Sequence, residues 1–400
     1  MVRMAKRNRY QNKPQKNRKL TIIGRLLKLL LIMANAVTAL SLLLAFLSAY
    51  FSPSFSMTAS YCGLAFPYLL IANLGFVLLW LIVDYRFSLI SLSMILLNIN
   101  NIDRTYQLRP TEKPMVCANC VKVMSYNTKL FGLYDEEMKT MRDIRRNQVY
   151  ELFDRERPEI LCMQEYFYDG SGKLKFPTTD TIMQILHLDN LKRNCYQYFP
   201  INNKAKDYHY GMVIFSRYRI LDGNCVFSND SSTNAAVYVD VKFKSDTLRI
   251  YNVHLASMHM DADDYAMGKE IASRGMDDPN LDKKAKLLSK KVEKAFLERQ
   301  DQVQALRAHI DSCHYPIIVC GDFNDSPVSY AYHKVGHGMK DAFRESGGGR
   351  GKTYNGEAFP SFRIDYIFHD NRFKSFGYTT YDSLTVSDHF PIWTNISLLK

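Results

Sequence analysis

Two long stretches without a charged side chain limit what the first hundred residues of this chain can form. They run from Leu29 to Phe51 and from Tyr61 to Val83, and each contains 23 residues. A helix rises about 1.5 Å per residue, so each stretch is long enough to cross the roughly 30 Å hydrocarbon core of a bilayer. A secretory signal peptide has a shorter apolar core and would not be followed by a second full-length stretch. We therefore predict that the chain is anchored in a membrane.

A third apolar stretch, Phe87 to Ile102, leaves two topologies open. It has only 16 residues and contains three asparagines, so it is either a short third span or an interfacial helix. Two spans would leave the rest of the chain in the cytoplasm, and three would export it. The link of Asp84, Tyr85 and Arg86 is a tight turn with a cation, which suits a cytoplasmic hairpin. We expect three spans, which makes the chain a multi-pass protein of the cell (inner) membrane. The large domain that follows the spans would then lie on the extracytoplasmic side.

Most of the net positive charge of the chain comes from its first 28 residues. The 400 residues carry a formal charge of +12, but residues 1–28 contain ten Lys or Arg and no Asp or Glu. The remainder carries only +2, so the body is close to neutral. The positive-inside rule places the basic tail in the cytoplasm. A near-neutral body lacks the basic surplus that drives general nucleic-acid binding, although a local patch could suffice.

The eight cysteines do not decide the compartment. Seven of them follow residue 100, and an odd number cannot all pair with one another. Cys117 and Cys120 form a CxxC, but no second pair follows at the spacing of a zinc site, so we interpret this motif as a chance pair.

After a linker at residues 103–119, residues 120–400 show the pattern of a mixed α/β domain. Short apolar runs alternate with turn residues and helical stretches. The expected strands are 121–125, 160–163, 211–215, 248–253, 316–320, 363–368 and 393–397. Apolar residues recur every three to four positions between Leu281 and His309, which predicts an amphipathic helix. The polar stretch from Met258 to Asn280 reads as a loop, either a specificity element or an inert insertion.

Polar side chains follow several of the expected strands. If these strands share sheets, their ends can meet at one edge, and buried polar groups there need compensating partners. Carboxylate and amide oxygens suit a hard cation, Mg²⁺ or Mn²⁺, and imidazoles left over suit acid–base chemistry. The side chains in question are Asn127, Glu165, Asp322, Asn324 and Asp388, together with His254 and His389.

The order and spelling of these motifs resemble the endonuclease/exonuclease/phosphatase superfamily, which includes deoxyribonuclease, exonuclease III and sphingomyelinase branches. The resemblance covers about residues 120–400, and the apolar start resembles that of membrane-anchored bacterial members. The matching segments are SYN at Asn127, QE at Glu165, GMVIFSR from Gly211, NVHL at His254, GDFND from Gly321, RIDYIF at Asp365 and SDHFPI at Asp388 and His389.

The resemblance implies a four-layer α/β/β/α sandwich and hydrolysis of a phosphate ester with a divalent metal. By analogy, Asn127, Glu165 and Asp388 would bind the metal. Asp322 would orient or deprotonate the attacking water, and Asn324 would hold a phosphate oxygen. His389, polarised by Asp365, would act as base or stabilise the transition state, and His254 would protonate the leaving oxygen. The carboxylate that orients the acid histidine in the deoxyribonuclease branch has no counterpart that we can assign.

The substrate stays open between a nucleic acid and a phospholipid headgroup. Anchoring in a bilayer favours a membrane-proximal ester, because the substrate is then presented at high effective concentration. We infer no obligate protein partner. The competing hypothesis is a membrane-anchored binding or scaffold module that keeps the fold and has lost catalysis, although none of the motifs carries a replacement at a metal or acid–base position.

Overall fold

The computed structural model describes residues 15–109, 111, 120–133, 142–169, 177–191, 193–202, 208–228, 233–258, 264, 279–356 and 363–399. The chain divides into two compact bodies. The first comprises residues 1–43 and 67–98, and the second comprises residues 44–66 and 99–400. Most of the predicted loop from Met258 to Asn280 lies outside the described residues, as does most of the basic tail.

The first body is built from apolar helices. Helix α1 (Gln15–Leu47) and helix α3 (Phe66–Val83) are followed by a 3-10 turn η1 (Tyr85–Phe87) and helix α4 (Ser88–Leu97). Among the described residues, segments 22–47 and 66–83 are long and apolar enough to cross a membrane, with mean hydropathies of 2.3 and 2.2. The two apolar stretches singled out in the sequence are thus helical over most of their length.

Polar contacts inside this body fix the direction of α3 relative to α1. In the first half of α1 the Lys28 ammonium lies 2.7 Å from the carboxylate of Asp84, the residue that follows the end of α3. Further along, the Asn73 side chain of α3 donates to the carbonyl of Thr38 at 3.1 Å. The two helices therefore run antiparallel.

Helix α4 runs in the same direction as α1. Ser91 donates to the side-chain oxygen of Asn35 at 2.5 Å. Towards the ends of both helices, the Asn98 amide donates to the carbonyl of Leu42 at 3.1 Å. The predicted third stretch is interrupted at Asn98, because the chain continues as a separate helix α5 (Ile99–Thr105), which extends into the predicted linker.

The second body contains two mixed six-stranded sheets. One has the order β11 (Phe373–Thr380), β12 (Ile392–Leu398), β1 (Cys120–Asn127), β2 (Ile160–Asp169), β4 (Tyr208–Ser216) and β3 (Tyr196–Asn202). The other has the order β5 (Ile220–Ser228), β6 (Ala235–Phe243), β7 (Asp246–His254), β8 (Ile317–Asp322), β10 (Asp365–Asp370) and β9 (Met339–Asp341). Parallel pairing occurs between β1 and β2 and between β7 and β8.

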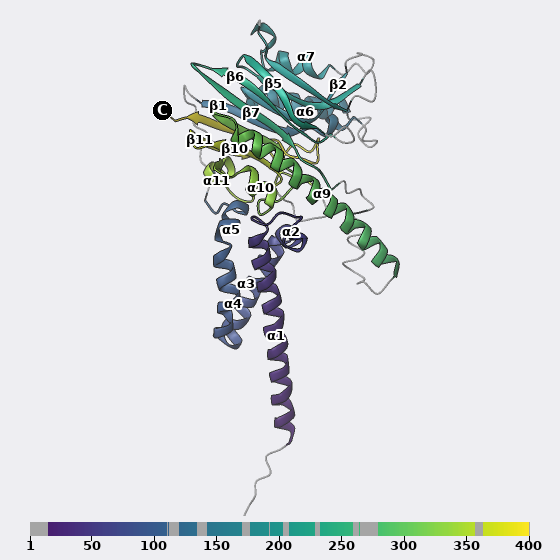
Figure 1. Cartoon of the computed structure of the whole chain (residues 1–400), viewed down its shortest axis with the longest axis vertical. Helices are drawn as coiled ribbons and strands as arrows, with labels where there is room; N and C mark the ends of the chain where they lie inside the picture. Colours follow the sequence, from purple (N-terminus) through teal and green to yellow (C-terminus); the bar gives the residue numbers. More distant parts are fainter. Residues whose placement is uncertain are drawn as a thin grey trace, which may run out of the picture. The chain divides into compact units, whose positions relative to one another are not determined.

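Helices cover the outer faces of the two sheets (Figure 1). Helices α6 (Arg142–Glu156) and α7 (Thr178–Ile185) pack on the sheet that contains β2, and helices α9 (Pro279–Asp311) and α10 (Tyr330–Val335) pack on the sheet that contains β8. Short elements complete the body: α2 (Met57–Leu64), η2 (Lys129–Gly132), η4 (Asp189–Leu191) and α11 (Ala342–Ser346). The predicted four-layer α/β/β/α sandwich is confirmed.

The alternation of side chains along β2 shows why the sequence needs four layers. Ile160 and Cys162 are buried between the two sheets, whereas Leu161 and Met163 are buried against the helices on the outer face. Because successive side chains of a strand point to opposite faces, a strand that is apolar at every position must be covered on both sides.

Cys120, at the start of β1, is disulfide-bonded. The interpretation of the CxxC as a chance pair is therefore wrong for this residue. Cys117 lies outside the described residues. Six further cysteines, namely Cys62, Cys162, Cys195, Cys225, Cys313 and Cys320, are free.

Candidate active site

Three polar residues lie in one row across the sheet that contains β8. His254, the last residue of β7, is the register partner of Asp322, the last residue of β8. Asp322 in turn is the partner of Asp365, the first residue of β10, which runs antiparallel to β8. Asp365 therefore reaches the edge from the start of its strand, whereas the other two residues reach it from the ends of theirs.

Gly321 allows β7 and β8 to approach closely beside this row. Its φ of +143° is a conformation that side chains rarely adopt, and a Cβ placed there would lie 1.9 Å from the carbonyl oxygen of Val253. The glycine of the GDFND segment is thus required by the backbone next to Asp322.

The facing sheet contributes Asn127 and Glu165. Asn127 ends β1, and its partner on β2 is Gln164. At Glu165 the pairing of β2 with β4 is interrupted by a register shift, and its φ of +46° departs from the extended conformation. The Asn127 amide donates to Asp322 at 3.0 Å and to Glu165 at 3.3 Å, so it joins the two sheets at the site.

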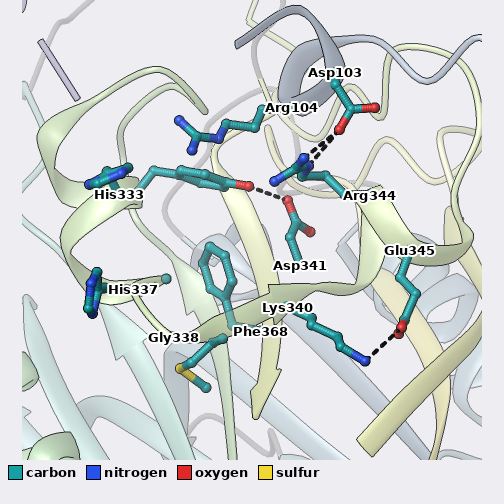
Figure 2. Close-up of a pocket in the computed structure, with 13 residues that line it drawn as sticks. Asp103, Arg104, His333, His337, Gly338, Lys340, Asp341, Arg344, Glu345 and Phe368 are labelled. Atoms are coloured by element: carbon teal, nitrogen blue, oxygen red, sulfur yellow. Dashed lines mark hydrogen bonds and ion pairs between the residues drawn. The ribbon is translucent and has the colours of Figure 1, made fainter. Parts of the chain in front are cut away.

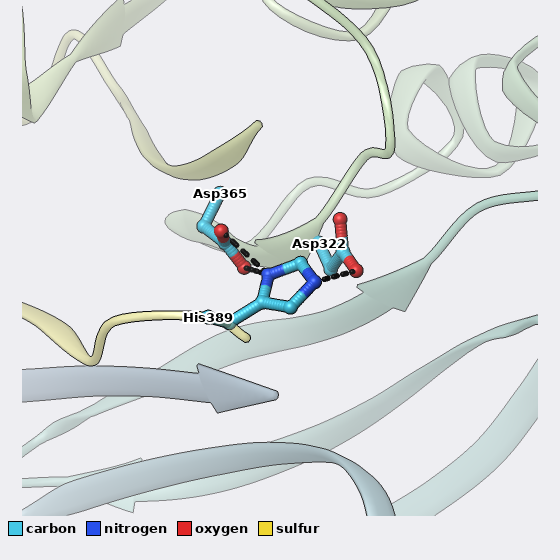
Figure 3. Close-up of side chains that lie close together, drawn as sticks. All are labelled: Asp322, Asp365 and His389. Carbon is cyan, nitrogen blue, oxygen red and sulfur yellow. Dashed lines mark hydrogen bonds and ion pairs between the residues drawn. The ribbon is translucent and has the colours of Figure 1, made fainter. Parts of the chain in front are cut away.

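His389 lies between two carboxylates (Figure 3). Its Nδ1 lies 3.0 Å from Asp365, and its Nε2 lies 3.5 Å from Asp322. Burial opposes protonation of this imidazole, but Asp365 and Asp322 outweigh that effect and hold the pKa of His389 well above its usual value. The hydroxyl oxygen of Thr353 accepts a hydrogen bond from the backbone N–H of Asp365, which fixes the start of β10.

His254 is oriented by a backbone carbonyl. Its Nδ1 lies 3.1 Å from the carbonyl oxygen of Thr233, and because a carbonyl can only accept, Nδ1 carries the hydrogen. Nε2 then faces Glu165 at 3.7 Å and Asp322 at 3.6 Å. The carboxylate that sequence reasoning could not find for this histidine is replaced here by the carbonyl of Thr233.

Asn324 is held beside Asp322. Its φ is +50°, and its backbone N–H donates to Asp322 at 2.8 Å. Its side-chain amide donates to Asp322 at 3.2 Å and to the carbonyl of Leu255 at 3.0 Å. Both amide hydrogens therefore already have acceptors within the protein. To donate to a phosphate oxygen, Asn324 must give up one of these two hydrogen bonds.

Asp388, the third predicted metal-binding residue, forms an ion pair with Lys129. The Lys129 ammonium lies 3.2 Å from the Asp388 carboxylate, and its backbone N–H donates to the side-chain oxygen of Asn127. Burial opposes ionisation of Asp388, but His389 and Lys129 together lower its pKa.

Sequence reasoning missed Lys129, and its backbone explains why. Lys129, Leu130 and Phe131 have consecutive positive φ values of 45°, 54° and 56°. No glycine or asparagine marks these positions, so the tight turn after β1 gives no local signal. Strain of this kind persists only where tertiary contacts enforce it, and it concentrates at functional sites.

The donor set fits a hard divalent cation. The carboxylates of Glu165, Asp322, Asp365 and Asp388 gather at one edge, and within the described part of the chain their ion-pair partners are Lys129 and two histidines. One carboxylate oxygen from each of Asp322 and Asp365 and one imidazole nitrogen of His389 lie within 4.8 Å of one another, which is close enough for them to share a metal ion. Glu165, whose side chain is 27% exposed, has no lysine or arginine partner among the described residues. A bound cation would balance this surplus of negative charge.

Two buried groups behind the site were also missed. Gln164 of β2 donates to Asn252 of β7 at 2.6 Å, which ties the two sheets together below Glu165 and His254. Arg299 of α9 donates to Asp325 at 3.1 Å and to the carbonyl of Ala256 at 2.7 Å. One guanidinium therefore links the segment after Asn324 to the segment after His254. The sequence does mark both residues, because Gln164 interrupts the apolar run of β2 and Arg299 lies among the apolar positions of α9.

The model of the Endonuclease/Exonuclease/phosphatase family matches residues 124–389, and a domain of unknown function matches residues 27–105. The comparison with curated proteins found no match.

Several solved structures are similar to this chain. A family protein from Leptotrichia buccalis is 13% identical, with 70% of this chain and 100% of that chain covered and a TM-score of 0.48. One from Bacteroides vulgatus is 17% identical, with 70% and 99% covered and a TM-score of 0.45. The human Nocturnin catalytic domain with bound sulfate anion is 16% identical, with 72% and 100% covered and a TM-score of 0.47. Since the family model matches well over half of its residues, the chain belongs to the endonuclease/exonuclease/phosphatase family, whose members hydrolyse phosphate esters and generally use divalent metals.

Proposed function

We propose that this protein is a membrane-anchored, divalent-metal-dependent phosphodiesterase or phosphatase that hydrolyses a phosphate ester by attack of an activated water. One observation carries the proposal: His389 is held between Asp365 and Asp322, and Asp322 is bound by Asn127, which also binds Glu165. A carboxylate–imidazole pair beside an oxygen-rich cation site is an arrangement suited to phosphoryl transfer.

Asn127, Glu165 and Asp388 would hold Mg²⁺ or Mn²⁺ in this proposal. When bound, such an ion neutralises negative charge on the phosphate oxygens as it develops. The Lys129 ammonium lies 3.2 Å from Asp388. Once Asp388 binds the ion, Lys129 would release this carboxylate and bind a phosphate oxygen or water instead.

The remaining roles follow from the hydrogen bonds of the chain. Asp322 is fixed by Asn127 and Asn324, so its carboxylate is positioned to orient a water for attack. His389 is held in one orientation by Asp365 and would take up the proton or stabilise the developing charge.

His254 is suited to donate a proton to the leaving oxygen. The carbonyl of Thr233 keeps Nδ1 protonated, which leaves Nε2 as the nitrogen that faces the site. The carboxylates of Glu165 and Asp322 lie 3.7 and 3.6 Å from Nε2, so this nitrogen is directed at the same site as the proposed metal and water positions.

We also propose that the domain lies on the extracytoplasmic side of the cell (inner) membrane. Contacts inside the second body support this placement, because the segment between α1 and α3 packs on the catalytic domain. Ser48 donates to the carbonyl of Val328 at 3.1 Å, and Gln300 accepts from the backbone N–H of Ser54 at 2.9 Å. If α1 crosses the membrane with its basic start in the cytoplasm, this segment and the domain bound to it both lie outside.

The direction of α4 supports a third crossing. Its contacts with Asn35 and Leu42 show that it runs parallel to α1, so it returns the chain to the side where α1 ends. The disulfide at Cys120 is a second support, because disulfides persist in oxidising compartments. Alkaline phosphatase and green fluorescent protein fused in turn after Lys400 provide the test. Phosphatase activity without fluorescence is expected, and the reverse would contradict export.

Hydrolysis of bis(p-nitrophenyl) phosphate by the purified full-length protein tests the activity. We expect turnover with Mg²⁺ or Mn²⁺ and none with EDTA. A screen of DNA, RNA, sphingomyelin and phosphoinositides would then choose between a nucleic acid and a phospholipid headgroup. No turnover with any of these esters and either metal would support the scaffold hypothesis instead.

A further inference from the structure

A cavity of about 390 Å³ lies in the second body (Figure 2), and its lining includes none of the candidate active-site residues. Its walls come from α5, from α10 and the turn after it, and from β9 and α11. The polar side chains that line it are Asp103, Arg104, His333, His337, Lys340, Asp341, Arg344 and Glu345. The rings of Tyr332 and Phe368 supply an aromatic wall.

The carboxylates in this lining already have partners. Asp103 pairs with Arg344 at 2.6 Å, and Glu345 pairs with Lys340 at 3.3 Å. Asp341 is bound by the buried guanidinium of Arg363, which does not line the cavity. The acidic groups are therefore neutralised by side chains of the protein itself.

Arg104 is the exception among the charged groups. It forms no ion pair with a carboxylate of the described residues, and its Nη1 donates to the amide oxygen of Asn101 at 3.1 Å. Its Nε is buried and has no hydrogen-bond partner in the part of the chain that the structure describes. A buried cationic donor without an acceptor carries a desolvation cost that an anion in the cavity would remove.

The two histidines that line the cavity, His333 and His337, can donate hydrogen bonds to an anion. Burial and the nearby Arg104 lower the pKa of His333 to about 4, so its imidazole is neutral at physiological pH and can donate a hydrogen bond. His337 is exposed at the mouth of the cavity. Arg104, His333 and His337 can thus donate to a ligand in the cavity without breaking an ion pair of the described residues.

Residues of the cavity follow the apolar helices closely in the sequence. Arg104 follows Asn98, the end of the first body, by only six residues, which is roughly 9 Å of helix. The ring of His333 contacts Tyr50 at 4.7 Å between centroids, and Tyr50 follows the end of α1 by three residues. Tyrosine is enriched at the level of lipid headgroups, a layer of about 5–8 Å on each side of the hydrocarbon core.

We propose that this cavity binds the phosphate headgroup of an anionic phospholipid, with Arg104 as the main phosphate ligand and His333 and His337 as further donors. This inference rests on the membrane placement proposed above and not on the catalytic activity. The cavity volume suits a phosphate with its glycerol group and excludes the acyl chains, which would stay in the bilayer. Occupancy would fix α5, and with it the catalytic domain, at a set height above the membrane.

Native mass spectrometry of the delipidated full-length protein tests this proposal. Phosphatidylglycerol, diacylglycerol and glycerol 3-phosphate are titrated separately, with EDTA present so that no ester is hydrolysed. We expect one phosphatidylglycerol to be retained, no retention of diacylglycerol and much weaker binding of glycerol 3-phosphate. Arg104→Gln should weaken retention of phosphatidylglycerol about tenfold, because a charge-assisted hydrogen bond is lost. Lys334→Gln on the same helix as His333, outside the cavity, should have no effect.

Equal retention by wild type and Arg104→Gln would mean that lipid binds only around the apolar helices, and would overturn the proposal. Equal affinity for glycerol 3-phosphate and phosphatidylglycerol would overturn the lipid assignment in favour of a soluble phosphate. His337→Gln, at an exposed position, provides a second variant that cannot fail through misfolding and should weaken retention by a smaller factor. Recovery of the protein in the soluble fraction without detergent would contradict the membrane placement itself, while the glycerol 3-phosphate titration would still report on the cavity.

Discussion

His389 and Asp365 are joined by a hydrogen bond of 3.0 Å although 24 residues separate them in the sequence. The bond aims the second nitrogen of the imidazole at Asp322, 3.5 Å away. We expect His389→Ala to lower phosphodiesterase turnover by about 10²–10⁴-fold, the usual contribution of a positioned acid–base group. Asp365→Asn should have a comparable effect, because it removes the charge that supports the imidazolium. Asp246→Asn, at the exposed start of β7, is the matched control, and near-normal turnover of His389→Ala would contradict the assignment.

Glu165 has no lysine or arginine partner among the described residues, so its replacement should affect metal binding in particular. We expect Glu165→Gln to raise the Mn²⁺ concentration needed for half-maximal activity and to weaken Mn²⁺ binding in isothermal titration calorimetry. The substitution keeps the size of the side chain, so the thermal unfolding midpoint without metal should stay close to that of wild type. Unchanged Mn²⁺ affinity would remove Glu165 from the metal site. Glu151→Gln on the exposed face of α6 is the control.

Gly321→Ala should destabilise the domain strongly. The new Cβ would lie 1.9 Å from the carbonyl oxygen of Val253, and the φ of +143° would be strained as well. We expect a loss of the order of 2–4 kcal/mol in the free energy of unfolding. Gly349→Ala also has a positive φ, but no atom lies within 4 Å of the added Cβ, so it should cost only about 1 kcal/mol. Equal losses in denaturant titrations of the two variants would show that β7 and β8 do not depend on this close approach.

Arg299 should act as a positioning residue. It is 1% exposed and pairs with Asp325, whose pKa is raised by burial. Arg299→Met leaves this carboxylate without its counterion, so a loss of about 3–5 kcal/mol in stability is expected. The double variant with Asp325→Asn should recover most of the stability. It should keep a reduced kcat, because the bond from Arg299 to Ala256 behind His254 is still missing. Full recovery of kcat would limit Arg299 to charge compensation.

Glu345 should give the folded protein a dependence on pH in the acid range. Burial opposes its ionisation, but hydrogen bonds from His369 and from Ser375 outweigh it and lower the pKa of Glu345 to about 2. The unfolded chain, with a pKa near 4.5, binds the proton first as the pH falls. The stabilisation is therefore present above pH 4.5 and is lost as the pH falls towards 2. The difference in Tm between wild type and Glu345→Gln should shrink over this window, and Tm curves that stay parallel would contradict the prediction.

Apolar periodicity was sufficient to predict the buried strands. The seven expected strands all occur, and the helix expected from 281 to 309 is α9. Sequence reasoning missed β3, β5, β9 and β11, which lie at sheet edges where strands such as β5 mix polar and apolar residues. It also missed β6, which lies inside its sheet and is mostly buried. Helix α6 was missed for a related reason, since it buries only Val149, Leu152 and Phe153 in an otherwise charged segment.

The residue types of the site could be predicted from their place after apolar runs, but their arrangement could not. Asp365 reaches the edge only because β10 is antiparallel to β8, and Glu165 only because β2 is irregular at that position. Both depend on pairing between strands that are distant in the sequence.

The sequence by itself determined the apolar helices, the strand pattern and the set of carboxylates, amides and imidazoles, because each is encoded by local periodicity or by the position of a polar residue. Only the tertiary structure decided that Thr233 orients His254, that Lys129 pairs with Asp388 and that Arg104 lines a cavity without an anionic partner among the described residues. These relations depend on which backbone groups and charges meet across the folded domain, and no local sequence pattern specifies them.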